Sequence, residues 1–308
     1  MIAAAAQHSF TEVWLNRLRN TTALAIIWAG LHYIVEGFVV PGGTHRPLVL
    51  VNAVGGPLGG LLLVAMMWGG AALTTVLIGA RDARKPLLIL GLGLALWTWG
   101  GGRQGGTMDT WLIFSHPTRN GPTSGPYLAL LGDYLYLLIG LAGAISLATI
   151  LSARRGGDTP PPGWLGFCAL TERPGHGVTA LVITTVVAGV IVFLAAGAGA
   201  TAGQTFRGQV HFAVLAGLAL GTYAASQIVK RPPAIWLWPA PILLGVVGLV
   251  GAAIDPALAL PDEYNDLDSI PAWGLARALP IEMVGVGLVA IAWIVPHGPQ
   301  AEEAEDGH

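Results

Sequence analysis

Residues 177–200 read GVTALVITTVVAGVIVFLAAGAGA, a run of 24 residues without a charged side chain. An α-helix rises about 1.5 Å per residue, so about 20 apolar residues cross the hydrocarbon core of a bilayer. This stretch therefore predicts a membrane-spanning helix, and similar stretches recur along the chain. We predict about eight spans, at 21–40, 57–79, 86–102, 126–152, 177–200, 208–229, 234–254 and 278–296.

The composition of the whole chain supports the same fold class. Of 308 residues, 54% are hydrophobic and only 10% are charged, whereas soluble domains carry about 25% charged residues. So few charges cannot cover a water-facing surface, and we expect an all-α, polytopic transmembrane helical bundle in contact with the lipid bilayer. The single cysteine, Cys168, excludes an intrachain disulfide and a cysteine-based metal site. A net charge of −2 gives no basic face of the kind that binds nucleic acid.

The distribution of lysine and arginine predicts the orientation in the membrane. Cytoplasmic loops carry an excess of these residues. With the N-terminus inside, ten of the 15 lie on the predicted inner side and five on the outer side. An even number of spans then places both termini in the cytoplasm. We expect a multi-pass protein of the cell's inner (plasma) membrane.

The two ends of the chain differ from the bundle at 21–296. Ser9 and Glu12 have the spacing of a capping box, and we interpret residues 1–20 as an interfacial helix that leads into the first span. Residues 297–308 contain four acidic side chains and predict an acidic cytoplasmic tail.

Five ionisable side chains fall inside the predicted spans, where they are costly and therefore candidates for function. All five lie in the outer half of the bilayer by their position along each span, within roughly two helical turns of depth. This asymmetry predicts a site near the outer face. The residues are His32 and Glu36 in the first span, Asp133 in the fourth, His211 in the sixth and Glu282 in the eighth.

Four of these side chains also have a purely structural interpretation. His32 and Glu36 stand four residues apart and share one helix face, so they can bind one metal ion, carry a proton, or bond each other and fix two helices together. His211 lies near a helix start, where it can reach interfacial water. Glu282 follows Pro280 in a first helical turn, where a carboxylate is favoured by the positive helix end.

Two segments resemble the haem–copper oxidase superfamily, especially the large subunit of nitric oxide reductase. HYIVEG at 32–37 is similar to the family's H-x-x-V-E-G stretch, whose His and Glu serve a non-haem iron. GQVHFA at 208–213 resembles the H-x-H helix that binds two haems, with His211 at the second position and Gln209 at the first. The segment FSHP at 114–117 is similar to the family's F-G-H-P.

The resemblance implies that His32 and Glu36 bind a transition metal, iron or copper, and that His211 binds a haem. The family's adjacent His-His pair has no counterpart here, and about eight spans replace twelve. The resemblance therefore implies a relative that holds one haem or one metal ion, or that depends on partner subunits.

Three functions follow from the sequence. The first is a membrane subunit of a redox or respiratory-type complex that holds a haem or metal near the outer face, together with other membrane subunits. The second is a secondary transporter that uses Asp133, Glu36 and Glu282 as coupling sites. The third is a non-catalytic scaffold subunit. The sequence contains no G-x-S-x-G, H-E-x-x-H or phosphate-loop motif that would indicate a hydrolase or nucleotidase.

Overall fold

A computed structural model describes residues 2–39, 49–50, 56–80, 82–99, 108, 124–156, 174–197, 207–229, 234–256 and 274–295, with side chains from residue 11 onward. Within these ranges the chain is helical and contains no strand, which confirms the all-α prediction. The predicted tail at 297–308, Cys168 and the FSHP segment lie outside the described residues.

Every predicted span coincides with a helix. Within the described residues, six helices are long and apolar enough to cross a membrane, at 11–39, 57–78, 125–155, 174–196, 207–228 and 234–254. Two others have only 16 and 15 residues. The elements are α1 (Ile2–Gly30), a π-turn η1 (Leu31–Val35), α2 (Glu36–Val39), α3 (Pro57–Ile78), α4 (Arg84–Trp99), α6 (Gly125–Gly156), α7 (Pro174–Gly197), α8 (Arg207–Ile228), η3 (Ala234–Trp236), α9 (Ala240–Ile254), η5 (Gly274–Ala276) and α10 (Pro280–Ile294).

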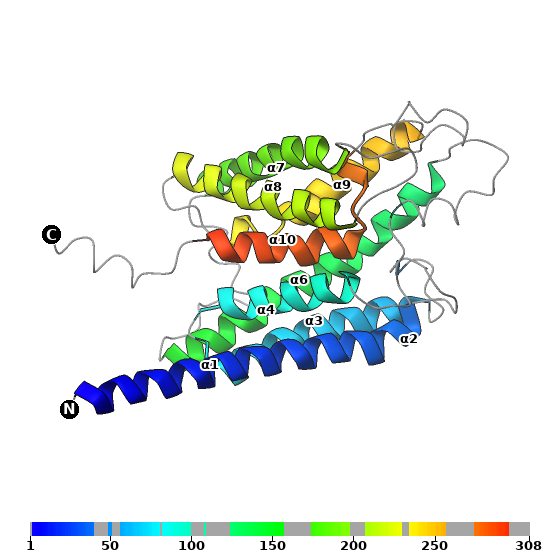
Figure 1. The fold of residues 1–308 in the computed structure, drawn as a ribbon. Helices are drawn as coiled ribbons and strands as arrows, with labels where there is room; N and C mark the ends of the chain where they lie inside the picture. The colour runs from blue at the N-terminus through cyan, green and yellow to red at the C-terminus, as the bar shows by residue number, and fades with distance from the viewer. Residues whose placement is uncertain are drawn as a thin grey trace.

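The long helices run in alternating directions across the bundle (Figure 1). At one end, Arg84 at the start of α4 donates from Nη1 to the carbonyl oxygen of Val295, just beyond α10, at 2.6 Å. At the other end, Ser124 before α6 donates from Oγ to the carbonyl oxygen of Ala253 at the end of α9, also at 2.6 Å. We call this second end, where α6, α8 and α10 begin, the outer end, because it corresponds to the predicted outer side.

The short helix α10 occupies the centre of the bundle. It packs against α4, α6, α8 and α9, and 12 of its 15 residues are buried. Helix α1 packs against α3 and α4 on one side, and α7 packs against α8 on the other (Figure 1). A helix surrounded by protein can end below the membrane surface, because non-helical backbone is tolerated there when protein covers it.

Glycines allow the closest helix contacts. A Cβ at Gly91 of α4 would lie 2.9 Å from the carbonyl oxygen of Gly285, and a Cβ at Gly285 would lie 2.9 Å from the amide nitrogen of Ala95. On the other side, a Cβ at Gly221 of α8 would lie 2.5 Å from the carbonyl oxygen of Thr184 in α7. Small residues let membrane helices approach in this way, and here they bring α4 against α10 and α8 against α7.

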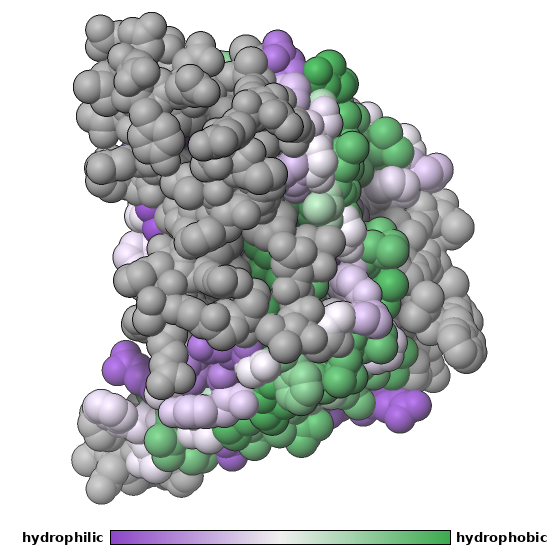
Figure 2. Space-filling view, turned by 90° about the vertical axis from the view of Figure 1, so that its right-hand side faces the viewer, coloured by the Kyte–Doolittle hydropathy of each residue, from purple (hydrophilic) through white to green (hydrophobic). Residues whose placement is uncertain are grey.

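The outward face of α7 is apolar. Val178, Val182, Val186 and Val190 are all about half exposed, and their spacing of four places them on one helix face. The view onto the outer end shows hydrophobic residues along the right and lower flank of the bundle (Figure 2). An apolar exterior of this kind is suited to lipid contact.

The N-terminal helix is continuous. Helix α1 runs without a break from Ile2 to Gly30, so the predicted interfacial helix at 1–20 and the first span form one rod. Residues 11–20 are all exposed and include Glu12, Arg17 and Arg19. An interfacial role for this part of α1 stays a prediction.

Candidate functional site

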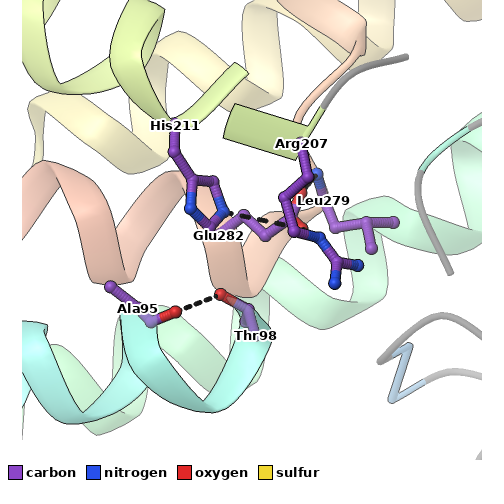
Figure 3. Close-up of polar contacts among 6 residues, drawn as sticks. All are labelled: Ala95, Thr98, Arg207, His211, Leu279 and Glu282. Atoms are coloured by element: carbon purple, nitrogen blue, oxygen red, sulfur yellow. Dashed lines mark hydrogen bonds and ion pairs between the residues drawn. The ribbon is translucent and has the colours of Figure 1, made fainter. Parts of the chain in front are cut away.

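Three charged or polar side chains meet at the outer end, between the starts of α8 and α10. Arg207 donates from Nε to Oε1 of Glu282 at 3.0 Å. Nε2 of His211, one turn further along α8, lies 3.7 Å from the same oxygen, which is too long for a direct hydrogen bond. Figure 3 shows Arg207 and His211 reaching from α8 toward Glu282. We call Arg207, His211 and Glu282 the outer-end cluster.

The start of α10 fixes the position of Glu282. Pro280 occupies the first turn of the helix, where a missing N–H costs nothing. The other carboxylate oxygen of Glu282, Oε2, accepts a hydrogen bond from the backbone N–H of Leu279 at 3.0 Å. The first N–H groups of a helix have no partner within it and carry partial positive charge. Glu282 thus stabilises its own helix start, as its place in the sequence indicates, and binds Arg207 as well.

The cluster is buried and balanced in charge. The side chains of Glu282 and His211 are 3% and 9% exposed, and that of Arg207 is 15% exposed. Such a pair offsets the desolvation of each ion only while both partners stay in place. The His211 ring packs against Trp99 of α4, with ring centroids 5.2 Å apart, and its Nε2 has no hydrogen-bond partner.

Sequence reasoning missed Arg207. The predicted sixth span began at 208, so Arg207 was counted among the outer loop charges. The signal was available, because Arg207 and His211 stand four residues apart and share a helix face when α8 begins one residue earlier.

The predicted pair His32 and Glu36 lies in contact in the first span. His32 Nδ1 is 2.5 Å from Glu36 Oε2, yet the two atoms lack the alignment of a hydrogen bond. The His32 ring stacks on Trp28 at 5.0 Å, and the side chains of His32 and Glu36 are 25% and 12% exposed. His32 belongs to the π-turn η1, and Glu36 ends it. Single π-turns inside α-helices are rare and occur frequently at functional sites.

Asp133 of α6 is fully buried and serves as an anchor. Its Oδ2 accepts a hydrogen bond from the backbone N–H of Leu50 at 2.9 Å. The bond joins residues 83 positions apart and fixes the short stretch 49–50, which precedes α3, against α6.

The five predicted residues therefore divide among three places. His32 and Glu36 lie on η1 and α2, which pack on α3, whereas His211 and Glu282 lie on α8 and α10. Helices α4 and α10 lie between α1 and α8 (Figure 1). Among the residues that the structure describes, no group of three or more His, Cys, Asp or Glu side chains is placed to hold a metal ion.

Comparison with known proteins gives no relative from which a function can be inferred, so a functional argument must start from these side chains. No model of a protein family, no curated protein and no solved structure matches the chain.

Proposed function

We propose that the chain is a secondary carrier of the cell's inner membrane that translocates protons through the outer-end cluster. The eight described helices that coincide with the predicted spans would cross the membrane, with both termini in the cytoplasm. The alternating helix directions support this topology, as does the position of Arg84, Lys85, Arg154 and Arg155 at the end opposite the cluster.

A single observation carries the proposal. The buried ion pair between Arg207 and Glu282 has an imidazole nitrogen without a hydrogen-bond partner beside it. Imidazole takes up and releases protons near neutral pH. Chains of Asp, Glu and His inside membrane proteins are the usual components of proton pathways, because few other side chains there exchange protons.

The chemistry of the cluster couples protonation to helix contact. A proton on Nε2 of His211 adds a positive charge 3.7 Å from Glu282 and competes with Arg207 for the carboxylate. A proton passed on to Glu282 removes the negative charge and releases Arg207. Because Arg207 starts α8 and Glu282 starts α10, either event changes the contact between these helices at the outer end. Movement of helices around a fixed site is how such carriers alternate their access.

The first test is proton flux into proteoliposomes that hold the full chain and an internal pH-sensitive dye. After an acidic step outside, we expect Glu282→Gln to reduce the initial rate of internal acidification at least about tenfold, because the amide cannot take up the proton. Glu12→Gln, the same change at an exposed position of α1, should leave the rate unchanged. Wild-type flux equal to that of protein-free liposomes, or unaltered flux in Glu282→Gln, would contradict the proposal.

A second candidate function is a redox-linked membrane subunit that binds a transition metal through His32 and Glu36. The proximity of an imidazole and a carboxylate on one helix face favours it, since both groups are ligands of transition metals. These residues also carry the resemblance to the nitric oxide reductase subunit. A haem on His211 fits less well, because its Nε2 faces the carboxylate of Glu282. Further metal ligands would come from partner subunits.

Metal analysis and the absorption spectrum of the chain, purified from its native membrane with any partners, test this candidate. We expect bound iron or copper near one ion per chain, and a reduction of at least about tenfold in His32→Ala, since even supporting groups of a metal site contribute that much to affinity. His176→Ala, at the start of α7, is the control. A folded protein that is colourless and free of iron and copper would exclude the redox candidate and leave the carrier or a scaffold.

A further inference from the structure

The carboxylate of Glu282 is held by its donors in the way that a bound anion is held. Its Oε1 accepts from Nε of Arg207 and its Oε2 accepts from the backbone N–H of Leu279, each at 3.0 Å. Guanidinium groups and the N–H groups at helix starts are common partners of carboxylates and other anions in proteins. The outer-end cluster therefore has the donors of an anion site, and a side chain of the protein itself occupies it.

His211 supplies a further position for a hydrogen bond that Glu282 does not use. The His211 side chain is 9% exposed, and its Nε2 has no hydrogen-bond partner although Oε1 of Glu282 lies 3.7 Å away. Figure 3 shows the ring directed from α8 toward Glu282. Buried polar atoms without partners are rare in native proteins, and each one requires a reason. An anion that lies closer to the ring than Glu282 does would accept from Nε2 when this atom carries a hydrogen.

The charge balance of the cluster depends on Glu282. Helix α8 begins at Arg207 and α10 begins at Pro280, and a helix start carries partial positive charge. Glu282 lies in the first turn of α10, whereas the first turn of α8 has no acidic side chain. A proton on Glu282 removes the negative charge that balances Arg207 within the cluster, and losing one charge of a buried pair is costly. A small anion that enters from the outer end would restore the balance.

We propose that the outer-end cluster binds a small carboxylate, which replaces the carboxylate of Glu282 beside Arg207 and His211 when Glu282 takes up a proton. The inference rests on the proposed proton carriage and names the substrate class of the same site. A carboxylate fits because the planar guanidinium matches its geometry and because the present occupant is one. The cluster has the same net charge with ionised Glu282 as with neutral Glu282 and one bound monovalent anion. A carrier that moves both would therefore carry one proton with each anion.

The first experiment vacates the site and refills it with acetate. A Glu282→Ala variant lacks the carboxylate and one methylene, which are the groups that acetate supplies. By calorimetry of the detergent-solubilised full chain at neutral pH and constant ionic strength, we expect acetate to bind at least about tenfold more tightly than chloride or the neutral isostere acetamide, because a charge-assisted hydrogen bond contributes at least this factor. The preference should vanish in Arg207→Ala with Glu282→Ala. Acetate that binds Glu282→Ala no better than acetamide would overturn the site.

The second experiment uses the wild type, so it holds even where Glu282→Ala fails to fold. Trifluoroacetate stays ionised at acidic pH, and fluorine NMR measures its binding in detergent. We expect its dissociation constant to fall at least about tenfold from neutral to acidic pH, as Glu282 takes up its proton. Arg19→Ala, which removes an exposed arginine of α1, should keep this dependence, whereas Arg207→Ala with Glu282→Gln should abolish it. Wild-type binding that is indifferent to pH, or a pH dependence that survives in this double variant, would overturn the site.

Both experiments measure binding rather than flux, so they distinguish this inference from the proposed function. If wild-type proteoliposomes carry no protons but both carboxylates bind as expected, the carrier proposal fails and the cluster stands as a carboxylate site. If proton flux depends on Glu282 and neither carboxylate binds in the expected way, the carrier stands and the inferred substrate class is wrong.

Discussion

An Arg207→Ala variant is expected to lose about 3–5 kcal/mol of unfolding free energy, which is the usual cost of leaving one charge of a buried pair without its partner. Glu282 is 3% exposed and cannot recover its hydration. The backbone N–H of Leu279 would still bond to Oε2, but that single bond does not replace a guanidinium.

Thermal unfolding in detergent, followed by circular dichroism, measures the effect. The double variant Arg207→Ala with Glu282→Gln is the decisive control, because it removes both charges and keeps an oxygen that accepts from Leu279. We expect it to recover a large part of the stability. A single variant as stable as wild type would show that the ion pair does not hold α8 against α10.

The sequence was sufficient for the helices because a bilayer imposes a simple rule. Length and apolarity predicted α7 from its letters alone, with bounds of 177–200 against the observed Pro174–Gly197. Length and apolarity do not suffice for α4 and α10, because helices of 16 and 15 residues are too short to cross the hydrocarbon core alone. Their place between α1 and α8 depends on contacts such as Gly91 against Gly285, which no local pattern specifies.

The candidate site was predictable only where its geometry is local. The contact between His32 and Glu36 and the bond from Leu279 to Glu282 follow from spacings of four and three residues. The partners that give the outer-end cluster its charge balance are not local, since Arg207 and Glu282 are 75 positions apart. The sequence also could not show that the five predicted residues divide among three places. Their depth along each span does not say which helices are neighbours.

The second large effect is expected at Asp133. An Asp133→Ala variant leaves the buried N–H of Leu50 without its acceptor, and an unsatisfied buried donor costs about 1–3 kcal/mol. Asp133→Asn should lose much less, because its amide oxygen can still accept from Leu50. Unfolding by heat in detergent compares the two, and equal losses in both would show that the charge of Asp133, rather than its bond to Leu50, holds the segment before α3.

The asparagine variant also separates the two roles assigned to Asp133. It keeps the anchor but cannot take up a proton, so a protein that is nearly as stable as wild type should lose proton flux in proteoliposomes if Asp133 serves as a coupling site. An anchor without a proton role predicts the opposite pattern, with stability and flux both close to wild type. The substitution removes the ability to take up a proton and keeps the oxygen that accepts from Leu50. It therefore shows whether the buried Asp133 serves only the fold or also proton transport.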